Sequence, residues 1–173
     1  MEWIVENLFS LLSVISLAVG GTLTLIQWNK SVKLRRAEFI SQIIEKLRFD
    51  KEMANIMYMI DYDENWYDGN FHGDEKREFS IDKLLSYLSY ICYLIDVKHI
   101  TKKETSILEY ELIRACRSYQ VQSYLFNLYH WSKRQNSLCS FHYLINYGLN
   151  EGIIDKVVFE NKNSGKYPRN LNF

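Results

Sequence analysis

The hydrophobic pattern begins with a long apolar segment near the N-terminus. From Leu8 to Ile26 the chain carries no charged residue. At a rise of 1.5 Å per residue, a helix of this length covers about 28 Å, close to the ~30 Å thickness of the hydrocarbon core of a bilayer. The sequence therefore predicts a transmembrane helix within residues 1–30.

The residues that flank this segment predict its orientation. Acidic residues precede it, basic residues follow it, and a tryptophan stands at each end, where aromatic rings favour the membrane interface. The expected interface residues are Trp3, Trp28, Lys30, Lys33, Arg35 and Arg36. Because positive charge stays on the cytoplasmic side, we expect a single-pass protein with its N-terminus outside and its C-terminal domain in the cytoplasm. A cleaved signal peptide is the alternative, but signal peptides begin with a basic leader and this leader is acidic.

Small and polar residues interrupt the apolar segment at steps of three or four, which places them on one face of a helix. They are Glu2, Glu6, Ser10, Ser13, Ser16, Gly20, Thr24 and Gln27. Packing between neighbouring helices is one interpretation, and spacing alone favours it. The other is a ring of identical helices whose polar faces line water, with Glu2 and Glu6 at the outer mouth. Both interpretations require self-association, because the chain has one predicted span.

The rest of the chain reads as helices of ordinary length. We expect helices over residues 31–49 and from Asp50, a solvated acidic loop over 61–78, and a further helix from Ser80. Thr101 and Glu104 form a capping-box pattern, and the long segment after them is expected to break near Ser118. A last helix is expected near residues 140–149. The buried positions are expected to include Ile81, Leu84, Leu85, Leu88, Ile91, Cys92, Ile95, Val121, Tyr124, Leu125, Leu128 and Trp131.

Composition supports an all-α fold, because 173 residues contain one proline and seven glycines. We expect an N-out transmembrane helix over residues 1–30, a cytosolic helical bundle over 31–160 and an exposed tail over 161–173. The formal net charge is zero, which argues against electrostatic binding of nucleic acid by the whole surface. The three cysteines are widely spaced and are expected to be buried free thiols.

The motifs of common enzyme and metal sites are missing from the sequence. No phosphate-binding loop, nucleophile elbow or zinc-protease motif occurs. The acidic loop fails as a calcium loop because Trp66 stands where the turn requires glycine. We therefore expect no cofactor, no metal and no small-molecule substrate.

One basic patch is a candidate for RNA chemistry. His130 and His142 lie near Arg114, Arg117 and Arg134 in the sequence, and imidazole with guanidinium can cleave RNA. Nearby aromatic residues could stack on bases: Tyr119, Tyr124, Tyr129 and Trp131. The plainer interpretation is that these aromatic side chains fill the core and the arginines face water, and we expect a protein that is not an enzyme.

The layout resembles a group of small bacterial membrane proteins with an outward-facing N-terminal span and a helical cytosolic domain. The resemblance rests on a W-x-K…R-R-x-E-F continuation of the span and on residues 84–104. The motif residues are Trp28, Lys30, Arg35, Arg36, Glu38 and Phe39. Within this group, length and layout are most similar to the accessory membrane proteins of type VI-B CRISPR systems.

The resemblance implies an oligomeric inner-membrane pore that strengthens antiphage defence by dissipating the membrane potential. It also implies a divergent HEPN-like domain and, as a partner, an RNA-guided effector nuclease or its RNA. Active RNases of the HEPN class carry an arginine, four to six residues and then a histidine. Here the nearest pair is Arg134 and His142, with seven residues between them, so the sequence departs from the nuclease pattern. Two alternatives to a pore are a membrane-tethered HEPN-like RNase that uses these two residues and a non-enzymatic docking module that recruits a soluble effector to the membrane.

Overall fold

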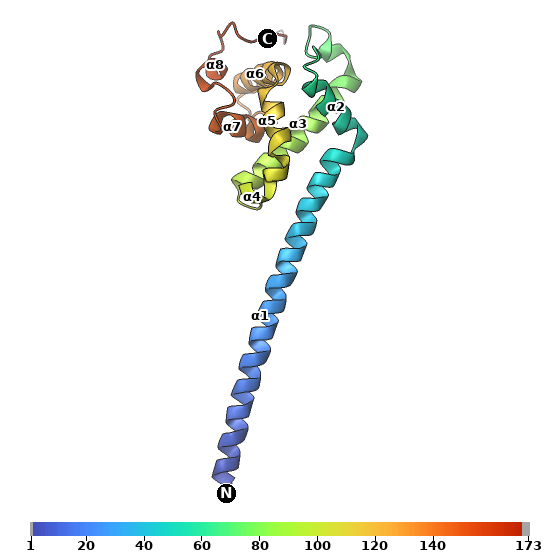
Figure 1. The fold of residues 1–173 in the computed structure, drawn as a ribbon. Coiled ribbons are helices and arrows are strands. Elements are labelled where there is room, and N and C mark those ends of the chain that lie inside the picture. Colours follow the sequence, from blue (N-terminus) through green and yellow to red (C-terminus); the bar gives the residue numbers. More distant parts are fainter. Residues whose placement is uncertain (1, 171–173) are drawn as a thin grey trace. The chain divides into compact units, whose positions relative to one another are not determined.

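The computed structural model describes the backbone of residues 2–170 and the side chains of residue 7 and residues 11–170. This described part is all-α, as predicted (Figure 1). Its elements are α1 (Glu2–Phe49), α2 (Lys51–Asp61), η1 (Phe71–Gly73), α3 (Glu75–Asp96), α4 (Lys102–Thr105), η2 (Ser106–Leu108), α5 (Glu109–Arg117), α6 (Tyr119–Arg134), α7 (His142–Asn150) and α8 (Lys156–Glu160).

The chain divides into two compact units, Met1–Ile43 and Ile44–Phe173. The first unit is helical throughout its described part and belongs to the single helix α1. Within the first unit, residues 32–35 and 37–39 are exposed.

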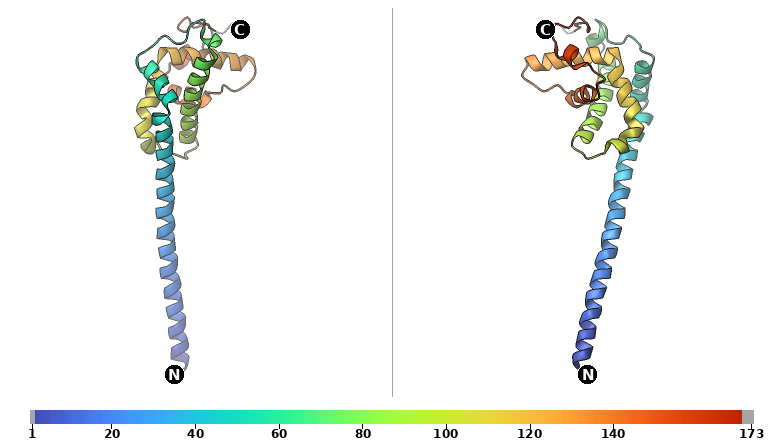
Figure 2. Two further views of the ribbon diagram at one scale, coloured as in Figure 1. Left: turned by 90° about the vertical axis from the view of Figure 1, so that its right-hand side faces the viewer. Right: turned by 60° about the vertical axis from the view of Figure 1, so that its left-hand side comes forward.

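The second unit is a helical bundle. Helix α3 packs against α7 and α2, and α5 packs against α2, α6 and α7 (Figure 2). The predicted apolar positions of α3 from Ile81 to Cys92 are buried, whereas Ile95 is half-buried. In α6, Val121, Tyr124 and Leu125 are buried as predicted. Trp131 is wrong as a core position, because 43% of its surface is exposed.

Local capping signals in the sequence give the correct helix starts. The Asp50 carboxylate accepts from the backbone N–H groups of Glu52 and Met53. Thr101 and Glu104 form the predicted capping box at the start of α4. Ser118 separates α5 from α6, as expected, and its hydroxyl caps α6 by accepting from the Val121 N–H. These caps depend on neighbouring residues alone, which is why the sequence predicts them.

The acidic loop between α2 and α3 is not simply solvated. Trp66, Tyr67 and Phe71 are buried, and their rings contact Tyr124 of α6 at centroid distances of 5.2 to 6.1 Å. Helix α3 starts at Glu75 with Asp74 as its N-cap, earlier than the expected Ser80. The loop therefore contributes Trp66, Tyr67 and Phe71 to the core, although its composition is strongly polar.

The tail over residues 161–173 was expected to be exposed. Within its described residues, 161–170, this prediction is wrong for Tyr167. Tyr167 is 3% exposed, and its hydroxyl donates to Gln122 Oε1 at 2.7 Å. The Asn127 amide donates to the Pro168 carbonyl, and the Asn170 amide donates to the Tyr67 carbonyl. The segment therefore runs along α6 and reaches the acidic loop (Figure 2).

Asp82 is a half-buried carboxylate inside the bundle. Its Oδ1 accepts from the Tyr124 hydroxyl at 2.7 Å. Desolvation raises the pKa of Asp82 above its ordinary value, and the charge of Glu78 raises it further, while the Tyr124 bond and the charge of His72 lower it. Desolvation outweighs the hydrogen bond here because a single donor replaces only part of the hydration shell of a carboxylate.

We expect Asp82 to weaken the fold as the pH rises. The native state binds this proton more tightly than the unfolded chain, so the free energy of unfolding falls as the pH increases from about 3.8 through the raised native pKa. Denaturant unfolding of the full chain in detergent, at several pH values, measures this slope. Asp82→Asn should be relatively more stable at pH 7 than at pH 4, compared with the unsubstituted chain. Tyr124→Phe removes the hydrogen bond that lowers the pKa of Asp82, so the free energy of unfolding should fall up to a higher pH. If Asp82→Asn and the unsubstituted chain differ in stability by the same amount at every pH, the raised pKa of Asp82 is contradicted.

Candidate functional site on helix α1

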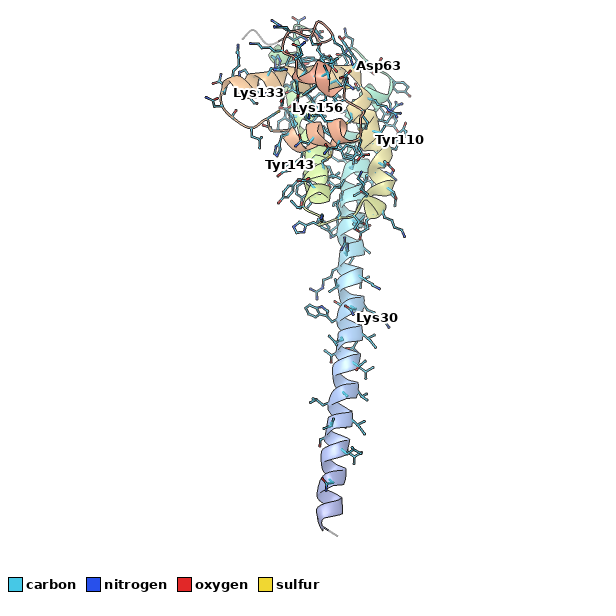
Figure 3. All side chains as sticks on the ribbon, turned by 90° about the vertical axis from the view of Figure 1, so that its left-hand side faces the viewer. Lys30, Asp63, Tyr110, Lys133, Tyr143 and Lys156 are labelled. Carbon is cyan, nitrogen blue, oxygen red and sulfur yellow. The ribbon has the colours of Figure 1, made fainter. Side chains whose placement is uncertain are left out.

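Helix α1 contains a stretch that is long enough and apolar enough to cross a membrane. Every residue from Leu11 to Lys30 is exposed, including Leu17 at 80% (Figure 3). Within Leu11–Phe49, an 18-residue stretch has a mean hydropathy of 1.7 and none of it is buried. Monomeric soluble proteins rarely expose so much contiguous apolar surface to water.

The polar stripe lies on this same stretch of α1. The helix is continuous from Glu2 to Phe49. Residues spaced by three or four therefore lie on one face of α1 along the whole stripe. The described members are Ser13, Ser16, Gly20, Thr24 and Gln27. The side chains of Glu2, Trp3, Glu6 and Ser10 lie outside the described residues, and with them the predicted acidic mouth.

The hydroxyls of Thr22 and Thr24 are hydrogen-bonded within α1. Thr24 Oγ1 donates to the Gly20 carbonyl at 2.8 Å, and Thr22 Oγ1 donates to the Ala18 carbonyl at 2.7 Å. Thr24 lies on the stripe, whereas Thr22 is about 200° away around the helix. Bonds to the carbonyl one turn earlier satisfy the hydroxyl donor without a second helix. Thr24 therefore requires no neighbouring chain as a hydrogen-bond acceptor, although its oxygen still offers lone pairs outward.

Gly20 is a costly residue for an exposed helix. In a helix interior, glycine is less favourable than alanine by about 1 kcal/mol. A Cβ atom at Gly20 would meet nothing within 4 Å, so packing inside this chain does not explain it. A helix position without a side chain permits either the close approach of another helix or a wider path for water. Both explanations need a second chain.

Aromatic and basic residues follow the apolar stretch in the expected order. Trp28 is 65% exposed, and Lys30, Lys33 and Arg35 are exposed, while Arg36 is half-buried (Figure 3). A tryptophan followed by basic residues is typical of a membrane–water boundary. The arrangement fits an apolar stretch that ends near Trp28.

In the structure, most residues of the expected basic patch make contacts within the second unit. His130 is buried, its Nε2 lies 2.9 Å from the Phe159 carbonyl, and desolvation lowers its pKa. Arg114 donates to Asp61 Oδ1 at 2.6 Å. His142 begins α7 and its Nδ1 lies 3.1 Å from the Cys139 carbonyl, while Arg134 lies exposed in the last turn of α6.

The cysteines are buried free thiols, as predicted. Desolvation raises the pKa of Cys116 to about 12 and raises the pKa values of Cys92 and Cys139 as well. Such thiols remain protonated at neutral pH and react slowly. Among the described residues, no group of three or more His, Cys, Asp or Glu side chains is placed to hold a metal ion.

The second unit has two grooves that the sequence analysis did not predict. One, of about 530 Å³, is lined by Phe79, Tyr87 and Tyr90 of α3 with Lys46 and Met53. The other, of about 300 Å³, lies between α2 and α5. The only sequence signal for them is that these aromatic residues fall outside the buried stripes of their helices.

Comparison of the chain with protein-family models, with curated proteins and with solved structures finds no match.

Proposed function

We propose that this chain is a homo-oligomeric, pore-forming protein of the bacterial inner membrane. Copies of α1 cross the bilayer with their N-termini outside and turn their polar faces toward shared water. The observation that carries the proposal is the polar stripe on an unbroken, fully exposed apolar helix. The second unit lies in the cytoplasm in this arrangement.

A water-lined ring accounts for more of the stripe than helix packing does. Packing explains the small residues, but it does not explain Gln27, which is large and polar. In the described part of the chain, no second apolar helix is present that could pair with α1. Thr24 already donates to its own helix and presents lone pairs outward, which suits contact with water or a cation. Self-association follows because one helix alone would expose the stripe to lipid.

The biological role rests on the resemblance to accessory membrane proteins of type VI-B CRISPR systems. In that role the pore dissipates the membrane potential and strengthens antiphage defence by an RNA-guided effector. The effector nuclease or its RNA is the proposed partner, and no catalytic step is assigned to this chain. The cytosolic bundle would receive the signal that opens the pore.

Reconstitution of the full chain in liposomes tests the proposal. We expect ion flux that dissipates an imposed potassium diffusion potential, together with a detergent-extracted particle several times heavier than the 20.7 kDa chain. A monomeric particle without flux would overturn the proposal. Cleavage of added RNA that disappears in Arg134→Ala, His142→Ala, without flux, would favour a membrane-tethered RNase instead.

A further inference from the structure

The part of α1 that follows the apolar stretch carries basic residues and no acidic one as far as Ala37. Lys30, Lys33 and Arg35 are exposed there, and they lie about 3 to 11 Å beyond Trp28 along the helix axis (Figure 3). The headgroup layer of a bilayer extends about 5–8 Å beyond the hydrocarbon core. Because lysine and arginine side chains are long, their charged groups lie at or beside the lipid headgroups.

Lys30 and Arg35 lie on opposite sides of the polar stripe. A helix turns by about 100° per residue, so Lys30 lies about 80° to one side of the centre of the stripe and Arg35 about 60° to the other side. When the stripes of several copies face shared water, the two sides of each helix face its two neighbours. Lys30 of one copy therefore faces Arg35 of the next copy at every contact in the ring.

These cations have no counterion in the described part of the chain. The side chains of Lys30, Lys33 and Arg35 make no ion pair there, and the next acidic residue, Glu38, does not pair with them. Packed helices lie about 8–10 Å apart, close to the ~8 Å Debye length of physiological salt. Salt therefore screens the repulsion between neighbouring copies only in part, and close assembly needs an anion at this depth.

Anionic phospholipids supply such an anion where these side chains lie. Each lysine or arginine near an anionic membrane surface strengthens the attraction about fivefold. Ammonium and guanidinium groups donate several hydrogen bonds, and phosphate oxygens accept them. A phosphate that is held in the bilayer has a far higher effective concentration at this depth than free phosphate in solution.

We propose that anionic phospholipid headgroups bind between neighbouring copies of α1 and bridge Lys30 of one copy to Arg35 of the next. Lys33 lies about 140° from the centre of the stripe, so it faces the surrounding bilayer and holds further anionic lipid. The proposal rests on the proposed function, because the two sides of the helix meet only if the stripes face a shared centre. Association of the chain in a membrane then depends on anionic lipid.

Energy transfer between fluorescently labelled copies of the full chain tests this dependence. The vesicles consist of phosphatidylcholine alone or of phosphatidylcholine with phosphatidylglycerol, at equal content of inserted protein. We expect transfer to be at least several-fold stronger when phosphatidylglycerol is present. Inorganic phosphate added to the phosphatidylcholine vesicles should not replace the lipid. Equal transfer in the two kinds of vesicle, or its restoration by inorganic phosphate, would overturn the proposal.

Two variants that make the same change in net charge show where the charge acts. Arg35→Glu places a carboxylate opposite Lys30 of the neighbouring copy, so transfer in phosphatidylcholine alone should rise to the level that the unsubstituted chain reaches with phosphatidylglycerol. Lys98→Gln, Lys103→Gln removes two exposed cations from the second unit and should keep the dependence on phosphatidylglycerol. If Arg35→Glu still requires anionic lipid, or if the control variant loses the requirement, the proposed contact is wrong.

The same vesicles separate this proposal from the pore itself. Transfer that depends on phosphatidylglycerol but brings no ion flux would leave the lipid contact standing and reject the pore. Ion flux with equal transfer in both kinds of vesicle would leave the pore standing and reject the lipid contact. The absence of transfer from both kinds of vesicle would reject self-association, and with it both proposals.

Discussion

Ion flux through reconstituted membranes should fall to the level of protein-free liposomes when Ser10, Ser13, Ser16 and Thr24 are all replaced by leucine. Leucine makes the stripe as apolar as the rest of the helix, and a narrow pore with an apolar wall loses its water. Insertion into the bilayer should persist, because leucine favours the membrane more than serine or threonine does. Ion flux, measured at equal protein content with a potassium-selective or fluorescent reporter, checks the prediction.

Thr22 and Thr24 provide a matched pair of controls for this experiment. Each donates to the carbonyl one turn earlier, at 2.7 and 2.8 Å, so leucine removes the same type of hydrogen bond at both positions. They differ in the face of α1 on which they lie. We expect Thr24→Leu to reduce flux at least several-fold and Thr22→Leu to leave it unchanged. Equal effects, or full flux in the fourfold variant, would reject a water-lined stripe.

The sequence predicts the helices of this protein where the signal is local. The apolar stretch, the capping box at Thr101 and the break at Ser118 each depend on residues within a turn or two of each other. The polar stripe is also local, because its members lie on one helix and their spacing alone defines the face. The sequence alone therefore predicts that the candidate site lies on one face of a helix.

One error is local, because the Asp74 cap that starts α3 at Glu75 was not recognised. The other errors lie where distant segments meet. Trp131 falls on the apolar side of a helical wheel, but no other segment covers it fully and 43% of it remains exposed. Tyr167 lies in a polar tail whose sequence predicts exposure, yet it is buried and its hydroxyl donates to Gln122 of α6. One groove lies between α2 and α5, which are about 50 residues apart in sequence, so periodicity on either helix gives no sign of it.

The acidic loop is the clearest case of a distant contact, and it leads to the largest expected effect on stability. We expect Trp66→Ala to lower the free energy of unfolding by about 3 kcal/mol, at the lower end of the 3–5 kcal/mol typical of buried tryptophan. Trp66 is 2% exposed, and its ring contacts those of Phe71 and Tyr124 at 5.4 and 6.1 Å. The effect falls at the lower end because Trp66 Nε1 is buried without a hydrogen-bond partner, and alanine removes that unsatisfied donor.

Trp131→Ala is the matched control for this prediction, because it removes the same side chain from a position that is 43% exposed. Trp131 keeps less of its surface buried than Trp66 does, so Trp131→Ala should lower the free energy of unfolding clearly less than Trp66→Ala. Denaturant unfolding of the full chain in detergent, followed by far-UV circular dichroism, measures both without relying on tryptophan fluorescence. If the two variants unfold at the same denaturant concentration, the loop is not part of the core. If Trp66→Ala is clearly the more destabilised variant, the loop joins α3 to α6 through its buried aromatic side chains.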